Sequence, residues 1–292
     1  PEHAEARAQA GAPISLFKAV EDWGYLRLVK EWSPSTLTIA RKLMPFDGAG
    51  GVQDWSPVQI QAYAAEYMAA YRSYLLQQAQ YDDGKRLTYI DWLELFNEPD
   101  PPGVQGYANL ARLAIEMLNI GETWDVPLKE FALFGLNAGT PEWDEMQAVA
   151  ETGLLERIAQ GGHILTLHEG VLPFSDPIDK YWPGSIPGAP AVERAGALCG
   201  RYRYWIHLAR QRGLYLRIDI SEFYSGPDYE LGSAAQIVER MAWYDNLVAQ
   251  DAEVLGFCPF TMGQGPPQDY GPFLPDFYTY AVSVKDRQNA GE

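Results

Sequence analysis

Cysteine, long apolar runs and a leader segment are scarce or absent in this 292-residue sequence. The only cysteines are Cys199 and Cys258, so we expect two free buried thiols and no disulfide framework. No run of about twenty uninterrupted apolar residues occurs, which argues against a membrane-spanning helix. No charged and then apolar signal segment opens the chain. The compartment stays open, with a slight preference for an extracellular location.

Positively charged residues are also few. Lys and Arg total 22 against 39 Asp and Glu, which gives a formal net charge of −17. This balance disfavours nucleic acid and anionic membrane surfaces as partners. A neutral substrate fits better, and the 9 Trp and 18 Tyr offer faces that stack on sugar rings, although aromatic residues also fill large cores.

Several chemical motifs are missing. The sequence has no G-x-G-x-x-G or G-x-x-x-x-G-K phosphate turn, no H-E-x-x-H or paired C-x-x-C spacing, and no G-x-S-x-G elbow. We therefore expect no nucleotide cofactor, no metal site and no serine nucleophile.

What the sequence does contain is an alternation of apolar runs with helical periodicity, which is typical of βα units around a parallel sheet. The expected strands are 14–20, 36–43, 89–96, 131–137, 163–168, 215–220 and 254–261. The expected helices are 57–80, 106–118, 142–159, 191–212 and 234–249, with a weaker one at 275–284.

This pattern predicts an α/β fold, a (β/α)8 TIM barrel formed as one domain over residues 1–292. One strand of the eight is not found. Residues 2–11 read as the tail of a first helix, so strand one is either absent or lies upstream of this chain. An open doubly wound sheet is the structural rival, but the phosphate turn typical of that fold is missing.

Two glutamates follow apolar runs in equivalent ways. Glu98 stands in Leu-Glu-Leu-Phe-Asn-Glu-Pro, where Pro99 ends the strand, and Glu222 stands in Ile-Ser-Glu-Phe. In a barrel the carboxyl ends of all strands surround one mouth, so both side chains are expected there. A pair of carboxyl groups is what glycosidic cleavage requires.

These two segments resemble the W-E-x-W-N-E-P and I-T-E-F segments of clan A glycoside hydrolases, the 4/7 superfamily. The resemblance implies that Glu98, at the end of strand four, is the acid/base and that Glu222, at the end of strand seven, is the nucleophile. It also implies a retaining mechanism on a β-linked glycoside or polysaccharide, with Asn97 holding the sugar 2-hydroxyl. Counting Glu98 as strand four is what exposes the missing first strand.

Other residues at strand ends are candidates for binding substrate. His168 lies where the clan often places an aromatic or His residue near the nucleophile, although a lone His is as often structural. The other candidates are Glu169, Lys18, Arg41 and Asn137, with Trp182, Tyr224 and Phe260 as stacking faces. The clan usually carries a Trp at the end of its last strand, and this sequence has none there.

Two rival functions remain open: a catalytically inactive carbohydrate-binding barrel, and another barrel hydrolase or lyase. If the clan mechanism holds, Glu98 is expected to stay protonated to higher pH than Glu222. These residues do not identify the sugar, the linkage or the oligomeric state.

Overall fold

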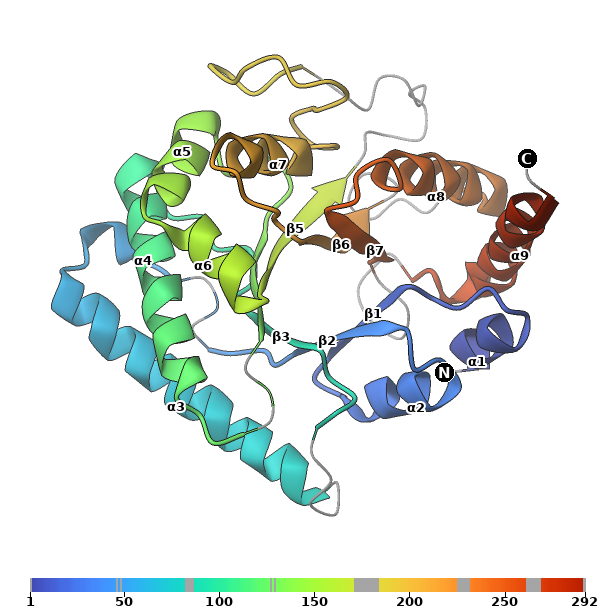
Figure 1. Cartoon of the computed structure of the whole chain (residues 1–292), viewed down its shortest axis with the longest axis horizontal. Helices are drawn as coiled ribbons and strands as arrows, with labels where there is room; N and C mark the ends of the chain where they lie inside the picture. The colour runs from blue at the N-terminus through green and yellow to red at the C-terminus, as the bar shows by residue number, and fades with distance from the viewer. Residues whose placement is uncertain are drawn as a thin grey trace.

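The computed structural model describes residues 2–45, 47, 49–81, 87–126, 128, 130–170, 184–224, 232–260 and 269–290. Its strands form one parallel sheet whose order is the chain order, curled into a ring (Figure 1). The strands are β1 Leu16–Val20, β2 Leu37–Arg41, β3 Trp92–Leu95, β4 Phe131–Leu136, β5 Ile164–Gly170, β6 Ile218–Tyr224 and β7 Val254–Pro259. The predicted TIM-barrel fold is therefore confirmed, with seven strands in the described residues.

Helices cover the outside of this ring (Figure 1). They are α1 Glu2–Gln9, α2 Gly24–Trp32, α3 Pro57–Tyr81, α4 Gly103–Glu122, α5 Trp143–Glu151, α6 Leu154–Gly161, α7 Tyr202–Gln211, α8 Ala234–Val248 and α9 Leu274–Ala290, with short 3-10 turns at Val52–Asp54 and Gly271–Phe273. In the described part of the chain, none is both long and apolar enough to cross a membrane.

Four elements differ from the sequence prediction. The helix expected at 142–159 is two helices, because Gly153 between them has a φ of 83°, in the left-handed region that glycine favours. Helix α7 begins at Tyr202 rather than at 191, because Glu169 accepts hydrogen bonds from the backbone N–H groups of Gly200 and Tyr202 and so fixes its start. Strand β6 begins three residues later and ends four residues later than predicted, so it includes Glu222. Helix α2 was not predicted, although it buries Leu26 and Val29 as an amphipathic helix does.

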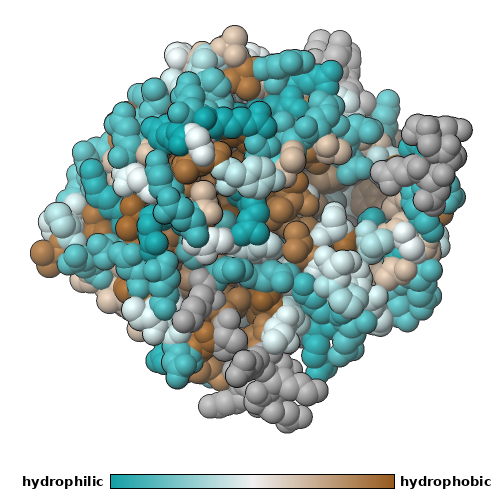
Figure 2. All heavy atoms as spheres, viewed as in Figure 1, coloured by the Kyte–Doolittle hydropathy of each residue, from teal (hydrophilic) through white to brown (hydrophobic). Residues whose placement is uncertain are grey.

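The side chains inside the barrel change from apolar to polar along the barrel axis. One residue from each of β1 to β5 builds a buried apolar cluster: Leu16, Ile39, Trp92, Ala132 and Ile164. Side chains two positions further along a strand point to the same side, so the next layer toward the carboxyl ends contains Lys18, Arg41, Glu94 and Thr166. Figure 2 shows hydrophobic residues in the middle of the viewed face, inside a mostly hydrophilic surround. An apolar floor thus supports a polar layer, which leads to the candidate site.

Candidate active site

Glu98 lies just beyond the carboxyl end of β3 on a contorted backbone. Phe96 and Glu98 both have positive φ values, 70° and 50°, which are unusual for residues with side chains and concentrate at functional sites. The backbone N–H of Glu98 donates a hydrogen bond to the carbonyl oxygen of Gly135 in β4, at 2.9 Å. This bond holds the turn after β3 against β4. The Glu98 side chain is one-third exposed and is therefore open to a substrate.

Glu222 lies within β6, where the pairing with both neighbouring strands is irregular. The register shifts between Leu167 and His168 on the β5 side and between Ile220 and Phe223 on the β7 side. Phe223 packs outward, stacked on Tyr244 of α8 at 3.9 Å between ring centroids. Its neighbour Glu222 faces inward, and only 6 % of its side chain is exposed.

His168 of β5 stands between the two carboxylates. Its Nδ1 lies 2.9 Å from Oε1 of Glu98 and 3.5 Å from Oε2 of Glu222. One oxygen of each carboxylate and one ring nitrogen all lie within 4.8 Å of one another. Gly135 leaves room for the ring, since a Cβ there would be 3.0 Å from Nε2. The two predicted glutamates are therefore neighbours in space, joined by a histidine that was also predicted.

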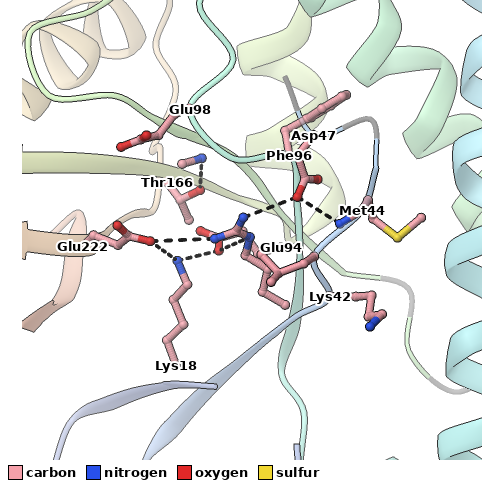
Figure 3. A network of polar contacts seen from close by, with 12 residues as sticks. Lys18, Lys42, Met44, Asp47, Glu94, Phe96, Glu98, Thr166 and Glu222 are labelled. Atoms are coloured by element: carbon pink, nitrogen blue, oxygen red, sulfur yellow. Dashed lines mark hydrogen bonds and ion pairs between the residues drawn. The ribbon is translucent and has the colours of Figure 1, made fainter. Parts of the chain in front are cut away.

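Two buried cations face Glu222 from β1 and β2 (Figure 3). Lys18 Nζ lies 2.6 Å from Glu94 Oε2 and 3.5 Å from Glu222 Oε1, and Arg41 Nη1 lies 3.8 Å from the same Glu222 oxygen. Arg41 also contacts Asp47, at 3.3 Å. Opposite charges this close favour the ionised forms of the carboxylates.

Two aromatic side chains lie beside Glu222. The Tyr224 hydroxyl donates to Glu222 Oε2 at 2.7 Å, so Tyr224 contacts the carboxylate directly. Its ring lies 5.3 Å from that of Phe260. Beside Glu98, the Asn97 Oδ1 atom is buried and has no hydrogen-bond partner among the described residues.

The charge environment differs from the expectation for Glu98. The hydrogen bond with His168 lowers the pKa of Glu98 below its ordinary value, with further help from the positive charges of Arg41 and Lys18. This lowered pKa does not support the expectation that Glu98 stays protonated to higher pH than Glu222, which stays a prediction. Burial alone would raise the pKa of Glu94, but the charges of Lys18 and Arg41 outweigh burial and lower it.

Glu169 lies away from this cluster. Its carboxylate points to the outside of β5, where it accepts hydrogen bonds from Gly200 N–H at 2.7 Å, Tyr202 N–H at 2.9 Å and the Tyr244 hydroxyl at 2.8 Å. Burial raises the pKa of Glu169 to about 7. The expectation that Glu169 binds substrate does not fit this placement, because successive side chains of a strand face opposite sides and His168 already faces inward.

The structure says less about two other residues that were predicted to bind substrate. Asn137 follows β4, and its carbonyl accepts hydrogen bonds from the backbone and the hydroxyl of Thr140. Trp182 lies outside the described residues.

Two polar residues of the cluster were not predicted. Asp47 holds Arg41 from the loop after β2, and no pattern in that loop marks it. Asp219 is fully buried, and burial raises its pKa well above the ordinary value. An acidic residue inside an apolar strand was a signal that could have identified Asp219.

Glu98, His168 and Glu222 are also the residues that could meet around a metal ion in the described part of the chain. The donor set suits this poorly, because Lys18 and Arg41 already face Glu222 and would repel a divalent cation. As they stand, the three side chains form a charge-assisted hydrogen-bonded cluster open on the Glu98 side.

Comparison with known proteins places this geometry in context. No family model and no curated protein matches the sequence. Among solved structures, a Bacteroidetes-affiliated GH5 cellulase is similar over 97 % of this chain and 82 % of its own, with 14 % identity and a TM-score of 0.50. The similarity to the GH1 β-glucosidase of Exiguobacterium antarcticum B7 extends over 98 % of this chain and 86 % of the β-glucosidase, with 11 % identity and a TM-score of 0.45. The similarity to the family 1 β-glucosidase of Thermotoga maritima extends over 97 % of this chain and 85 % of the β-glucosidase, with 12 % identity and a TM-score of 0.45. At such identities a likeness speaks for the fold, and the fold of this chain is the TIM barrel of the GH5 cellulase.

Proposed function

We propose that this protein is a retaining glycoside hydrolase in which Glu222 is the nucleophile and Glu98 the acid/base. The observation that carries the proposal is the distance between the two carboxylates, whose nearest oxygens lie within 4.8 Å. Retaining enzymes hold their carboxyl groups about 5 to 5.5 Å apart, whereas inverting enzymes need about 6.5 to 9.5 Å to admit a water molecule. This short distance between carboxylate oxygens supports direct attack by a carboxylate.

The reaction then runs in two displacements. Glu222 attacks the anomeric carbon while Glu98 gives its proton to the leaving oxygen, which breaks the glycosidic bond and leaves a glycosyl ester on Glu222. Glu98, now ionised, takes a proton from water as that water attacks the ester. The sugar leaves with its original anomeric configuration, and both carboxyl groups return to their starting states.

The neighbours of Glu222 suit it to the nucleophile role. Lys18, Arg41 and the Tyr224 hydroxyl all contact the Glu222 carboxylate and hold it in place for attack. Among the described residues, no Lys or Arg forms an ion pair with Glu98, and Glu98 is more exposed, as expected for the group that meets both the leaving oxygen and water. Since the hydrogen bond with His168 lowers the pKa of Glu98, the protonated acid is populated mainly at acidic pH, and we expect an acidic pH optimum.

The substrate we propose is a β-linked oligosaccharide or polysaccharide. The unpartnered Asn97 Oδ1, adjacent to Glu98, supports a contact with a sugar hydroxyl. The rings of Tyr224 and Phe260 offer an apolar surface beside Glu222. No residue of this set selects one sugar over another.

A trapping experiment tests the proposal directly. A 2-deoxy-2-fluoro glycoside with an activated leaving group should label the protein, and peptide mass spectrometry should find the sugar on Glu222. Glu222→Ala should not be labelled. Glu98→Ala should keep much of its activity on activated aryl glycosides and lose it on substrates whose leaving groups need a proton. A label on another residue, or the same loss in both variants for every leaving group, would overturn the assignment.

A carbohydrate-binding barrel without activity is the second candidate. It is favoured by one observation: β7, the last strand, offers Phe257 and Cys258 where the clan usually carries a Trp. Saturable binding of a glycan that is never cleaved, with affinity unchanged in Glu222→Gln, would support this candidate and exclude the hydrolase.

A further inference from the structure

A tyrosine of helix α3 supports the turn that carries Glu98. Tyr67 is 1 % exposed, and its ring lies 5.3 Å from that of Phe96, the residue directly after β3. Phe96 is completely buried and lies beyond the paired residues of β3, so its backbone N–H needs a partner outside the sheet. That N–H donates to the Tyr67 hydroxyl at 3.1 Å. Tyr67 thereby holds the backbone at Phe96, where φ is 70°, two residues before Glu98.

The same hydroxyl makes a second hydrogen bond. A backbone N–H can only donate, so the hydroxyl oxygen accepts from Phe96 and its own proton goes to Asp47 Oδ1, at 2.8 Å. Burial and the negative charge of Asp47 raise the pKa of Tyr67 well above its ordinary value, so the hydroxyl keeps this proton. The two hydrogen bonds of Tyr67 therefore have fixed directions.

Asp47 extends this constraint to the cation beside Glu222 (Figure 3). Its Oδ2 accepts from the Met44 N–H at 3.1 Å and lies 3.3 Å from Arg41 Nη2. The other terminal nitrogen of Arg41, Nη1, lies 3.8 Å from Glu222 Oε1. A guanidinium group is planar and rigid, so the contact of Nη2 with Asp47 also orients Nη1 toward Glu222.

The hydroxyl distinguishes Tyr67 from the other tyrosines of α3. The Tyr71 hydroxyl donates to the Glu94 carbonyl at 3.0 Å and accepts from the Lys42 N–H at 3.2 Å, so both of these partners are backbone groups. The Tyr74 hydroxyl donates to a backbone carbonyl as well, that of Glu21 at 3.0 Å. All three rings pack against other aromatic rings. The feature particular to Tyr67 is therefore a hydroxyl that joins the acid/base turn to a carboxylate.

We propose that Tyr67 is a positioning residue that keeps the acid/base turn and the cation of the nucleophile in one fixed arrangement. This inference rests on the proposed function, in which Glu98 and Glu222 act on the same bond. Two groups that act together must keep their relative placement, and an error of about 1 Å can lower a rate about 100-fold. Tyr67 is too buried to touch the sugar, and it acts through the contacts that run from Phe96 to Arg41.

Two substitutions separate the halves of this arrangement. Tyr67→Phe keeps the ring and releases both the acid/base turn and Asp47, whereas Asp47→Asn removes the charge that orients Arg41 and spares the bond between Tyr67 and Phe96. On aryl β-glycosides of graded leaving-group acidity, Tyr67→Phe should lower kcat and kcat/KM alike, about 10- to 100-fold, with KM within about twofold. Its loss in kcat/KM should grow as the leaving group becomes poorer. The loss in Asp47→Asn should be about equal for every leaving group.

Tyr74→Phe is the matched control, because it removes a hydroxyl of the same helix that bonds only the Glu21 carbonyl in the described residues. Its kcat should stay within about twofold of that of the unaltered protein. The double variant of Tyr67→Phe with Asp47→Asn should lose less than the product of the two single losses, since both substitutions break one hydrogen bond. If Tyr67→Phe loses no more than Tyr74→Phe, or only raises KM, or if the single losses multiply, Tyr67 does not position the pair.

Amide hydrogen exchange tests the same inference without any substrate. In Tyr67→Phe the amides of Phe96 and Glu98 should exchange about tenfold faster or more, relative to Leu165 of β5, whose N–H donates to the Arg217 carbonyl. The comparison with Leu165 corrects for a general loss of stability. If the unaltered protein cleaves no glycoside, the proposed function fails, and these amides still decide whether Tyr67 holds the turn. An unchanged ratio would overturn the positioning role whatever the activity.

Discussion

At the scale of single residues, His168 is the link between the two carboxylates. Removing its ring in His168→Leu takes away the hydrogen bond that contributes most to the lowered pKa of Glu98. The pKa of Glu98 then rises, so Glu98 stays protonated to higher pH. We expect the alkaline limb of kcat/KM against pH to move to higher pH, with a lower maximum.

His168→Asn serves as the control for this prediction, because an Asn amide can replace the Nδ1 donor. Its alkaline limb should lie nearer to that of the unaltered protein. If both variants keep the original limb, His168 does not set the pKa of Glu98.

Loss of Lys18 should also lower stability. Lys18→Met leaves Glu94, which is 1 % exposed, as a buried carboxylate without its nearest cation. Breaking a buried ion pair from one side typically costs about 3 to 5 kcal/mol in the free energy of unfolding. Since the pKa of Glu94 is lowered in the folded protein, its favourable contribution is present at neutral pH and fades as pH falls through that pKa.

Urea unfolding of Lys18→Met at about pH 7 and at about pH 4 checks this. The deficit relative to the unaltered protein should be larger at the higher pH. A deficit that is equal at both values would mean that lost packing, and not the unpaired charge, explains the change.

At the scale of elements, the contact between α4 and β4 depends on a glycine. A Cβ on Gly121 would lie 2.4 Å from Cζ of Phe131, which is completely buried. Gly121→Ala should therefore lower the free energy of unfolding by about 1 to 3 kcal/mol, although alanine is the better helix former. Chemical denaturation measures the loss.

The double variant Gly121→Ala with Phe131→Leu should recover part of that loss, since the shorter side chain makes room. Gly50→Ala is the neutral control, because no atom lies within 4 Å of its added Cβ. A stable Gly121→Ala protein would show that the helix can shift away from the strand at little cost.

At the scale of the whole molecule, the net charge of −17 is spread over a surface with few cations. Mutual repulsion of these charges disfavours the compact state, and salt screens it. Raising sodium chloride from about 10 to about 200 mM at neutral pH should raise the melting temperature by about 2 to 4 °C. Calorimetry with choline chloride as the matched salt separates screening from a specific effect of sodium. An unchanged or lower melting temperature would show that surface repulsion does not limit stability.

The local sequence determined much of this protein. The alternation of apolar runs and helical periods is a property of nearby residues, so it predicted the parallel strands in order and the barrel fold. Asn97-Glu98-Pro99 and Ser221-Glu222-Phe223 marked two strand ends, and parallel strand ends share one edge, so the sequence also predicted that Glu98 and Glu222 meet.

Tertiary structure alone decided the rest, because the direction in which a side chain points and the residues that it contacts depend on segments far apart in the chain. His168 and Glu169 are adjacent in sequence, yet one joins the carboxylates and the other holds the start of α7 from outside the barrel. The pKa of Glu98 is lowered by a residue 70 positions away, which no local pattern reveals. Asp47 reaches Arg41 only because a loop folds back over the strand end. A sequence can place a carboxylate at a strand end, but its protonation is set by the charges that folding brings to it.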